Sequence, residues 1–287
     1  MKRTLLVLLV VIMAFTSCYF TSEPDNLPTL GMIAYYSFDG NVKDQYIFDN
    51  HCTDSTSSGY VDGIKGLAKD FNGETDMLHL QSPLNANEGL TFSFWLKSKG
   101  VKIGQENGVV ICKYNKDNGG RFFNINTQAS LTTSNPSLRG NFYAYANTSS
   151  YRDCAYSDIM SMDGVTSGDD TLLYTLHNPM KLPLNEWTHC VINVTETEIQ
   201  AWINGVLTVS KTREYSEYGI SAYDRSDIPS YIGNCPALGY GDNNHYHGAI
   251  DEMRIYKRPL SPEEIIYIFQ NTHSDISPIN STKVQSS

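Results

Sequence analysis

Alternating apolar and polar residues occupy short stretches along most of the chain. The clearest stretch is TFSFWLK (91–97), which puts Phe92, Phe94 and Leu96 on one face. A period of two is typical of a β-strand with one buried face, so this stretch is predicted to be a strand. Turn-forming residues separate it from other stretches of the same kind. Further strands are predicted at residues 33–38, 77–80, 108–114, 121–128, 140–146, 171–176, 187–195, 198–205 and 247–258.

A single helix is predicted near the C-terminus. Ser261 can cap this helix, Pro262 suits its first turn, and Glu264 completes a capping box with the serine. The helix is expected to run from Glu263 to about Gln270.

The order of these elements indicates an all-β sandwich or jelly roll. Asn204 and Gly205 form a strong hairpin signal, because both residues readily take the positive φ values of a type I′ turn. No strands alternate with long helices, which argues against Rossmann and TIM-barrel enzymes. The polar stretch at 148–170 is predicted to be a long loop, and such loops on rigid scaffolds often carry function.

The first residues have the pattern of an export signal. Lys2 and Arg3 precede an uninterrupted apolar run at 5–15, which is too short to span about 30 Å of hydrocarbon as a helix. The Phe-Thr-Ser-Cys sequence that follows resembles a bacterial lipobox, which implies that Cys18 is lipidated. An ordinary cleavable signal with an incidental cysteine is the alternative. The expected boundaries are 1–17 for the signal peptide, 18–29 for a polar tether and 273–287 for a polar tail.

The charge balance narrows the choice of partner. Without Lys2 and Arg3, the 21 basic residues fall to 19 against 31 acidic ones, a net charge of −12. So acidic a chain argues against nucleic acid or an anionic membrane surface as the partner. It is compatible with a neutral polysaccharide and with divalent cations.

Five cysteines follow Cys18 at long, irregular spacings. No CxxC pair occurs, so a zinc site is not expected. An exported protein can form disulfides, but the sequence leaves their pairing open. Cys190 alternates with Ile192 and Val194, which favours a buried apolar role for this cysteine. The five are Cys52, Cys112, Cys154, Cys190 and Cys235.

Three segments together resemble bacterial laminin-G-like, concanavalin A-like jelly-roll domains. The opening strand and turn of that family resemble AYYSFDGNVKD (34–44), and its central hairpin resembles LNEWTHCVINVTETEIQAWINGVL (184–207). Its closing strand and capped helix resemble GAIDEMRIYKRPLSPEEI (248–265). The resemblance covers about residues 30–271. It implies a concanavalin A-like (laminin-G-like) jelly-roll sandwich of two antiparallel sheets with one short C-terminal helix, in a domain spanning 30–272.

The resemblance also implies a structural calcium ion near one edge of the sheets. Calcium takes six to eight oxygen ligands, and a turn rich in Asp and Asn can supply them. The candidate metal ligands are Asp39, Asn41, Asp44 and Asp251. The alternative is that Asp39 and Asn41 only form an Asx-type turn and that Asp251 accepts backbone hydrogen bonds.

A sugar site is predicted from aromatic residues mixed with polar ones. Aromatic rings stack on pyranose rings, while a few placed polar groups bond the hydroxyls. The loop at 240–247 and a second cluster at 143–152 have this mixture. For the second cluster, a tyrosine pair on one face of an ordinary strand is the alternative. The candidate ligand-binding residues are Tyr240, Asp242, Asn243, His245, Tyr246, Tyr143 and Arg152.

The three tryptophans receive different expectations. Trp187 is expected in the core. Trp95 and Trp202 are out of phase with the most apolar faces of their strands. They are therefore expected either on a ligand-binding sheet face or under a covering loop.

No catalytic motif accompanies these features. Concanavalin-like glucanases place two carboxylates on one face of a strand, about 5 Å apart for retention. Glu196 and Glu198 sit at a predicted hairpin turn, and Asp251 and Glu252 are adjacent and so face opposite sides. No nucleophile-elbow, zinc-protease or phosphate-loop motif occurs.

The sequence therefore predicts a non-catalytic, carbohydrate-binding lipoprotein. It is expected to be exported and lipid-anchored to the bacterial membrane, at the outer membrane or cell surface. A protein-binding adhesion or assembly module is the alternative, and a polysaccharide hydrolase or lyase ranks last.

Overall fold

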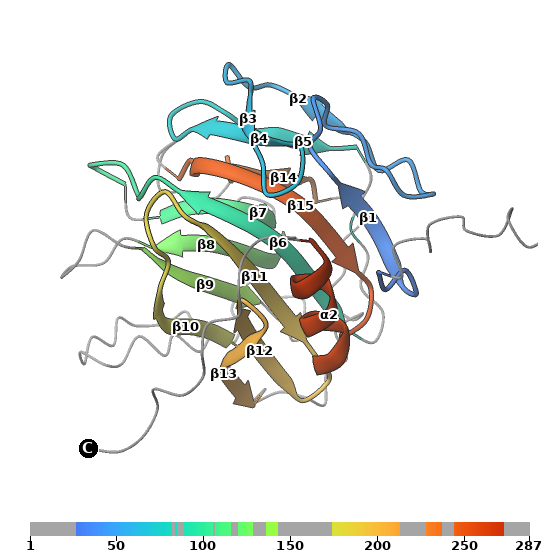
Figure 1. Cartoon of the computed structure of the whole chain (residues 1–287). Coiled ribbons are helices and arrows are strands. Elements are labelled where there is room, and N and C mark those ends of the chain that lie inside the picture. Colours follow the sequence, from blue (N-terminus) through green and yellow to red (C-terminus); the bar gives the residue numbers. More distant parts are fainter. Residues whose placement is uncertain are drawn as a thin grey trace, which may run out of the picture.

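Two antiparallel sheets stacked face to face form the body of the protein, as seen in a computed structural model of the chain (Figure 1). The all-β jelly roll with one C-terminal helix is thereby confirmed. No helix in the described part of the chain is long and apolar enough to cross a membrane. The structure describes residues 27–81, 84, 89–105, 107–115, 120–128, 136–142, 174–212, 228–236 and 244–272.

The first sheet has eight strands. They are β1 (Met32–Tyr36), β3 (Tyr60–Asp62), β4 (Leu67–Asn72), β6 (Leu90–Ser98), β11 (Trp187–Val194), β12 (Glu198–Ile203), β13 (Val206–Thr212) and β15 (His247–Tyr256). Their order is β13-β12-β11-β6-β15-β4-β3, and β1 pairs with β15 beside this path.

The second sheet has seven strands. They are β2 (Cys52–Asp54), β5 (Leu78–Leu80), β7 (Asn107–Asn115), β8 (Gly120–Gln128), β9 (Ser137–Phe142), β10 (Tyr174–Lys181) and β14 (Ser230–Ile232). Their order is β10-β9-β8-β7-β14-β5-β2.

The main core lies between the two sheets. Phe92, Phe94 and Leu96 of β6 are buried in it, so the face predicted from their alternation is confirmed. Phe123 of β8 comes from the opposite sheet, and its ring centroid lies 4.7 Å from that of Phe92. Alternate residues of both sheets therefore interdigitate, as in other β-sandwiches.

The last strand of the described chain lies inside the eight-stranded sheet. On one edge β15 pairs with β6. On the other edge, residues 247–250 pair with β4 and residues 253–256 pair with β1. The register with β6 shifts between Asp251 and Arg254, where Glu252 takes a positive φ of 50°.

The predicted hairpin turn is confirmed. Asn204 and Gly205 connect β12 to β13 with φ values of 50° and 75°. Both values lie in the left-handed region that a type I′ turn requires, and Asn and Gly tolerate it best.

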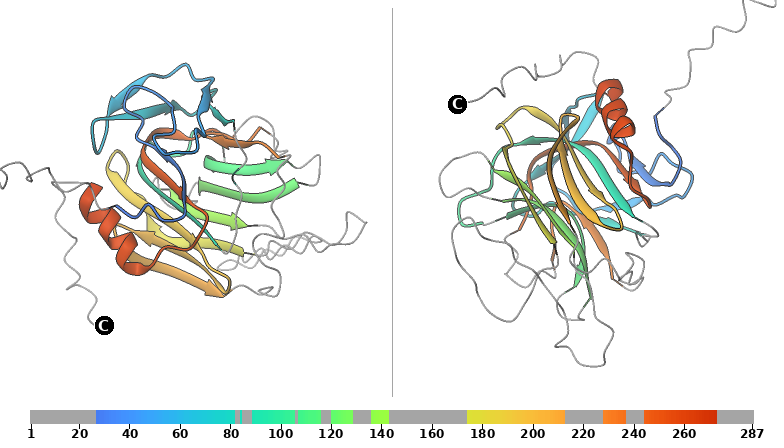
Figure 2. Two further views of the ribbon diagram at one scale, coloured as in Figure 1. Left: turned by 90° about the vertical axis from the view of Figure 1, so that its right-hand side faces the viewer. Right: turned by 90° about the horizontal axis from the view of Figure 1, so that it is seen from below.

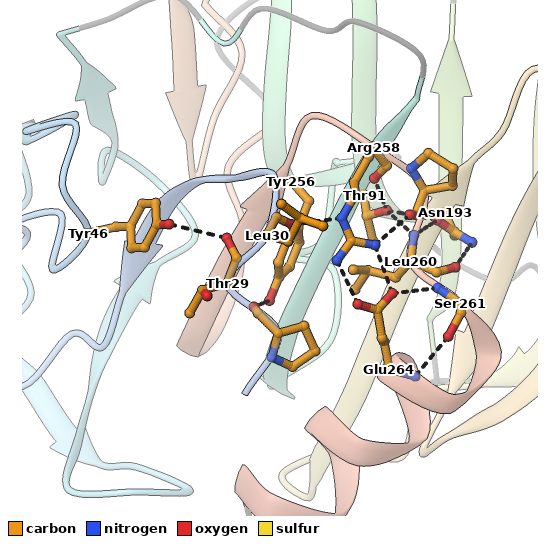
Figure 3. Close-up of polar contacts among 12 residues, drawn as sticks. Thr29, Leu30, Tyr46, Thr91, Asn193, Tyr256, Arg258, Leu260, Ser261 and Glu264 are labelled. Atoms are coloured by element: carbon orange, nitrogen blue, oxygen red, sulfur yellow. Dashed lines mark hydrogen bonds and ion pairs between the residues drawn. The ribbon is translucent and has the colours of Figure 1, made fainter. Parts of the chain in front are cut away.

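The predicted helix is present as α2 (Pro262–Thr272) and is slightly longer than expected at both ends. Its capping box is confirmed (Figure 3). The N–H of Glu264 donates to Ser261 Oγ at 3.3 Å, and the N–H of Ser261 donates to Glu264 Oε2 at 2.9 Å.

Two side chains fix the helix to the eight-stranded sheet (Figure 3). Arg258 donates from Nη1 and Nη2 to the two carboxylate oxygens of Glu264, at 2.7 and 2.6 Å. Asn193 of β11 bonds both backbone groups of Leu260, accepting from its N–H and donating to its carbonyl, each at 3.0 Å. These hydrogen bonds hold the segment between β15 and α2 against the eight-stranded sheet.

A second apolar layer separates α2 from the sheet beneath it. Trp202 packs there with Ile265 and Ile268. Trp95 is fully buried, and its ring stacks on that of Phe269 of the helix. The two tryptophans therefore lie under α2 and not on a sheet face open to a ligand. Trp187, by contrast, is half-buried rather than a core residue.

Candidate functional site

Two of the four expected calcium ligands lie against one turn, which connects β3 to β4. The Asp251 carboxylate is fully buried and accepts a hydrogen bond from the N–H of Ile64 at 2.8 Å. Asp39, from the loop after β1, accepts one from the N–H of Leu67 at 2.7 Å. The structure thus brings Asp39 and Asp251 to opposite ends of the same turn.

The other two expected ligands are used within their own loop. The Asp44 carboxylate accepts hydrogen bonds from three backbone N–H groups at 2.9 to 3.0 Å. Asn41 Oδ1 accepts one from the N–H of Lys43 at 2.9 Å. The described residues contain no group of three or more His, Cys, Asp or Glu side chains arranged to hold a metal ion. The four residues therefore do not fit a calcium site as one set.

Asp251 is the most perturbed of these carboxyl groups. Burial, together with the negative charge of Glu252, raises the pKa of Asp251 to about 7, against a partial offset from three backbone N–H donors. The charge of Glu252 is itself paired with Arg254, whose Nη2 lies 2.5 Å from Glu252 Oε2. A cation beside Asp251 would favour its ionised form.

The expected sugar-binding loop is only partly within the described chain. His245 and Tyr246 belong to the described residues. Outside them lie Tyr240, Asp242, Asn243, Tyr143 and Arg152, together with Cys154 and with Cys18, the residue expected to be lipidated.

Tyr246 and His245 are both buried in contacts with other parts of the fold. The Tyr246 ring is fully buried in the main core and meets Phe71 edge-on, with centroids 6.2 Å apart. His245 is 5% exposed, and its ring nitrogens contact Asn234 Nδ2 at 3.2 Å and the carbonyl of Asp76 at 3.3 Å. Neither ring offers a free face to a ligand, because the chain here already runs beside β7 and leads into β15.

A different group of polar residues lies on the outer face of the seven-stranded sheet. Phe123 and Ile125 of β8 point into the core, so Asn124 and Asn126 point the opposite way. In the sheet register, Asn124 is paired with Cys112 of β7, Cys112 with Tyr231 of β14, and Tyr231 with His79 of β5. We call this row and its neighbour the polar face: His79, Tyr231, Cys112, Asn124 and Asn126.

The polar face contains amide oxygens that lack hydrogen-bond partners. Asn124 and Asn126 are 3% and 2% exposed, and the Oδ1 atom of each has no partner. Beside β7, Asn244 accepts the N–H of Val109 through its backbone carbonyl, while its own Nδ2 has no partner. Buried polar groups are nearly always hydrogen-bonded, because an unpaired one costs about 1–3 kcal/mol. These amides are therefore suited to bind a polar ligand or ordered water.

An aromatic pair lies at the other end of the same row. The rings of His79 and Tyr231 are stacked, with centroids 5.1 Å apart and planes at 27°. His79 is exposed and Tyr231 is half-buried. Burial, with the nearby thiols of Cys112 and Cys235, raises the pKa of Tyr231, so its hydroxyl stays protonated and can donate. The polar face thus combines a flat ring surface with hydrogen-bonding amides.

The fold of this chain also occurs in known proteins. The family model described as the concanavalin A-like lectin/glucanases superfamily matches residues 72–266. The chain belongs to this superfamily. The match includes every strand of the polar face, and the family expected from the three sequence segments is confirmed.

Solved structures of this superfamily's fold include several binding domains. Domain 4 of the extracellular arabinanase AbnA from Geobacillus stearothermophilus, in complex with arabinotriose, has a TM-score of 0.57 at 18% identity; the match covers 83% of this chain and 98% of that domain. The binding domain of Paraclostridial Mosquitocidal Protein 1 has a TM-score of 0.58 at 15% identity and covers 83% of this chain. This chain spans about half of that protein, 52% of its length.

The binding domain of botulinum neurotoxin DC, in complex with rat synaptotagmin II, is a further neighbour. Its TM-score is 0.52 at 11% identity, and the match covers 85% of this chain and 52% of that one. These likenesses concern the fold. A comparison with curated protein sequences gave no match.

The sequence contains a pattern that could have indicated the polar face, although its aromatic residues alone could not. In RFFNINTQ (121–128), two asparagines alternate with core residues inside a strand of this superfamily. Asparagine is disfavoured in strands, so its repetition on one face indicates a use other than folding. The amide groups themselves were predictable from the alternation, but their lack of partners was not.

Proposed function

We propose that this protein is a non-catalytic glycan-binding domain whose ligand lies on the polar face. The observation that carries the proposal is the stacked pair of His79, which is exposed, and Tyr231, which is half-buried, on the same face as the unpartnered amide oxygens of Asn124 and Asn126. Sugars present alternating hydroxyl groups and apolar ring faces, and both are matched by such a surface. The neighbour in complex with arabinotriose supports this reading at the level of the fold.

The proposal of binding without catalysis rests on the chemistry of this face. Glycoside hydrolysis uses two carboxyl groups flanking the scissile bond. Among the described outward positions of β5, β7, β8 and β14 in the polar face, none is Asp or Glu. We also propose export and lipid anchoring at Cys18, because the apolar run and the Cys at its end have the pattern of a lipoprotein signal.

Substitutions of the aromatic pair are expected to weaken glycan binding. The chain from residue 19 onward is first screened on a glycan array, and the best ligand is then titrated by calorimetry. His79→Ala and Tyr231→Ala should each weaken binding roughly tenfold or more, since each removes a ring surface on which the sugar stacks. Asn126→Ala should leave the free energy of unfolding unchanged or higher, because its buried Oδ1 has no partner to lose.

The matched controls lie on α2, on the other side of the molecule (Figure 2). Tyr267 and Asn271 are exposed on that helix. Tyr267→Ala and Asn271→Ala should bind the glycan like the wild type. A ligand whose affinity is unaffected by both polar-face variants would overturn the location. No binding to plant, microbial or host glycans by the folded protein would move the proposal to a protein partner, as in the neurotoxin complex.

A further inference from the structure

Two cysteines that are far apart in the sequence meet at the polar face, to which Cys112 belongs. Cys112 lies in β7, and Cys235 follows β14 by three residues. Because β7 and β14 pair, with Tyr231 opposite Cys112, the loop after β14 returns over this cysteine. Cys112 Sγ lies 3.5 Å from the carbonyl oxygen of Asn234, the neighbour of Cys235, so the two cysteines are close together.

The loop that carries Cys235 is held firmly in this place. The N–H of Cys235 donates to Asn234 Oδ1 at 2.7 Å, and the N–H of Gly233 donates to the carbonyl of Val110 in β7 at 3.0 Å. Both cysteines are buried, at 0% and 1% exposure. The closeness of the two cysteines is therefore part of the folded structure.

The surroundings of this pair argue against nucleophilic catalysis and against metal binding by these cysteines. Burial and the neighbouring Cys235 thiol raise the pKa of Cys112, whereas nucleophilic and metal-binding cysteines need a lowered one. The described residues offer no metal-binding group of three. Cys190 and Cys52 are buried as well, and burial raises the pKa of each thiol. Within the described chain, Cys112 and Cys235 are thus the thiols that are placed to react with each other.

We infer that Cys112 and Cys235 form a disulfide in the mature protein. The inference rests on the proposed export, since disulfides persist in oxidising compartments. The two thiols lose two protons and two electrons as the S–S bond forms. A disulfide oxidant, such as an oxidised thiol–disulfide oxidoreductase or oxidised glutathione, accepts them and becomes a dithiol or two thiols.

Such a bond would join β7 to the loop after β14, beside Tyr231. It would close a loop that includes β8 to β14, which restricts the unfolded chain strongly. It would also hold the backbone beside the aromatic pair of the polar face. The bond therefore predicts both a stability effect and a more rigid binding surface.

The test is oxidative refolding followed by mapping of the thiols. The chain from residue 19 onward is unfolded in reductant and refolded in a mixture of reduced and oxidised glutathione. The refolded protein is then denatured without reductant, its free thiols are alkylated, and the peptides are identified by mass spectrometry. We expect one cross-linked peptide pair that contains Cys112 and Cys235, with Cys52 and Cys190 alkylated.

The variants separate this bond from a general effect of reductant. In oxidised wild type and in C190S, reduction should lower the melting temperature by roughly 5–15 °C. In C112S and C235S, reduction should have no effect. Alkylation of both thiols in the folded, oxidised protein, or a different pairing, would overturn the inference.

The same mapping on protein recovered from cell envelopes separates the failures. A cross-link in the refolded protein with free thiols in the envelope protein would overturn the disulfide for the exported state and would count against export into an oxidising compartment. Glycan binding is measured on both redox forms, so its absence would affect only the proposed function.

Discussion

Replacing Arg254 with methionine is expected to lower the free energy of unfolding by about 3–5 kcal/mol. The guanidinium is buried at 2% exposure, and the carboxylate of Glu252 is buried at 1%. Arg254 Nη2 lies 2.5 Å from Glu252 Oε2, and Nη1 donates to the Glu252 carbonyl at 3.1 Å. Without the cation, Glu252 keeps a buried negative charge next to the carboxyl group of Asp251.

The electrostatics of Arg254 agree with this role. Burial opposes its charge, but the carboxylate of Glu252 and two tyrosines more than offset burial, so the pKa of Arg254 is raised. The guanidinium carbon also lies 4.4 Å from the centre of the Tyr35 ring. The arginine is thus stabilised as a cation from several sides.

Urea unfolding of a small set of variants checks this prediction. The double variant R254M/E252Q should recover much of the loss, because no uncompensated charge remains and Gln can still accept from the Tyr35 hydroxyl. Lys99→Met breaks the more exposed pair with Asp70 and should cost no more than about 1 kcal/mol. A loss in R254M as small as that in K99M would show that the buried pair contributes little.

Trp95→Ala is expected to cost about 3–5 kcal/mol, the second large effect. The Trp95 ring is fully buried between β6 and α2, and its centroid lies 5.8 Å from that of Phe269 and 5.2 Å from that of His189. Truncation leaves a cavity between β6 and α2, because the surrounding sheet and helix can relax into it only in part.

The control for Trp95 is another tryptophan of the same sheet. Trp187 begins β11 and is half-buried, with the Lys97 ammonium 5.8 Å from its ring centre. Trp187→Ala should therefore cost less than half as much in urea unfolding. If the two variants lost equal free energies of unfolding, the burial of Trp95 against α2 would contribute no extra stability.

The alternation of side chains was enough to predict the sandwich. One face of β6 packs in the main core, and the other face packs against α2. Both faces of the strand are therefore buried. The hairpin at Asn204 and the cap at Ser261 were predictable for the same reason: each depends on a few neighbouring residues and on backbone geometry.

The expected sugar-binding loop was harder to predict, because amino-acid composition does not show whether a side chain is buried. Tyr246 belongs to a mixture of aromatic and polar residues that suits a sugar site, yet its ring lies in the core. Asp44 belongs to a calcium-like sequence, yet three backbone N–H groups occupy its carboxylate. Both outcomes depend on contacts with distant segments, which local sequence does not specify.

The arrangement around β15 also determines when the protein can fold during its synthesis. Among the described strands, β1 pairs only with β15, and its partners are residues 253–256. Pairing of β1 therefore cannot begin until nearly the whole chain has been synthesised. Strands β4 and β6 also lack a pairing partner on one edge until β15 has been synthesised. Contacts of such long sequence separation form slowly. A nascent chain lacking β15 therefore cannot complete its larger sheet.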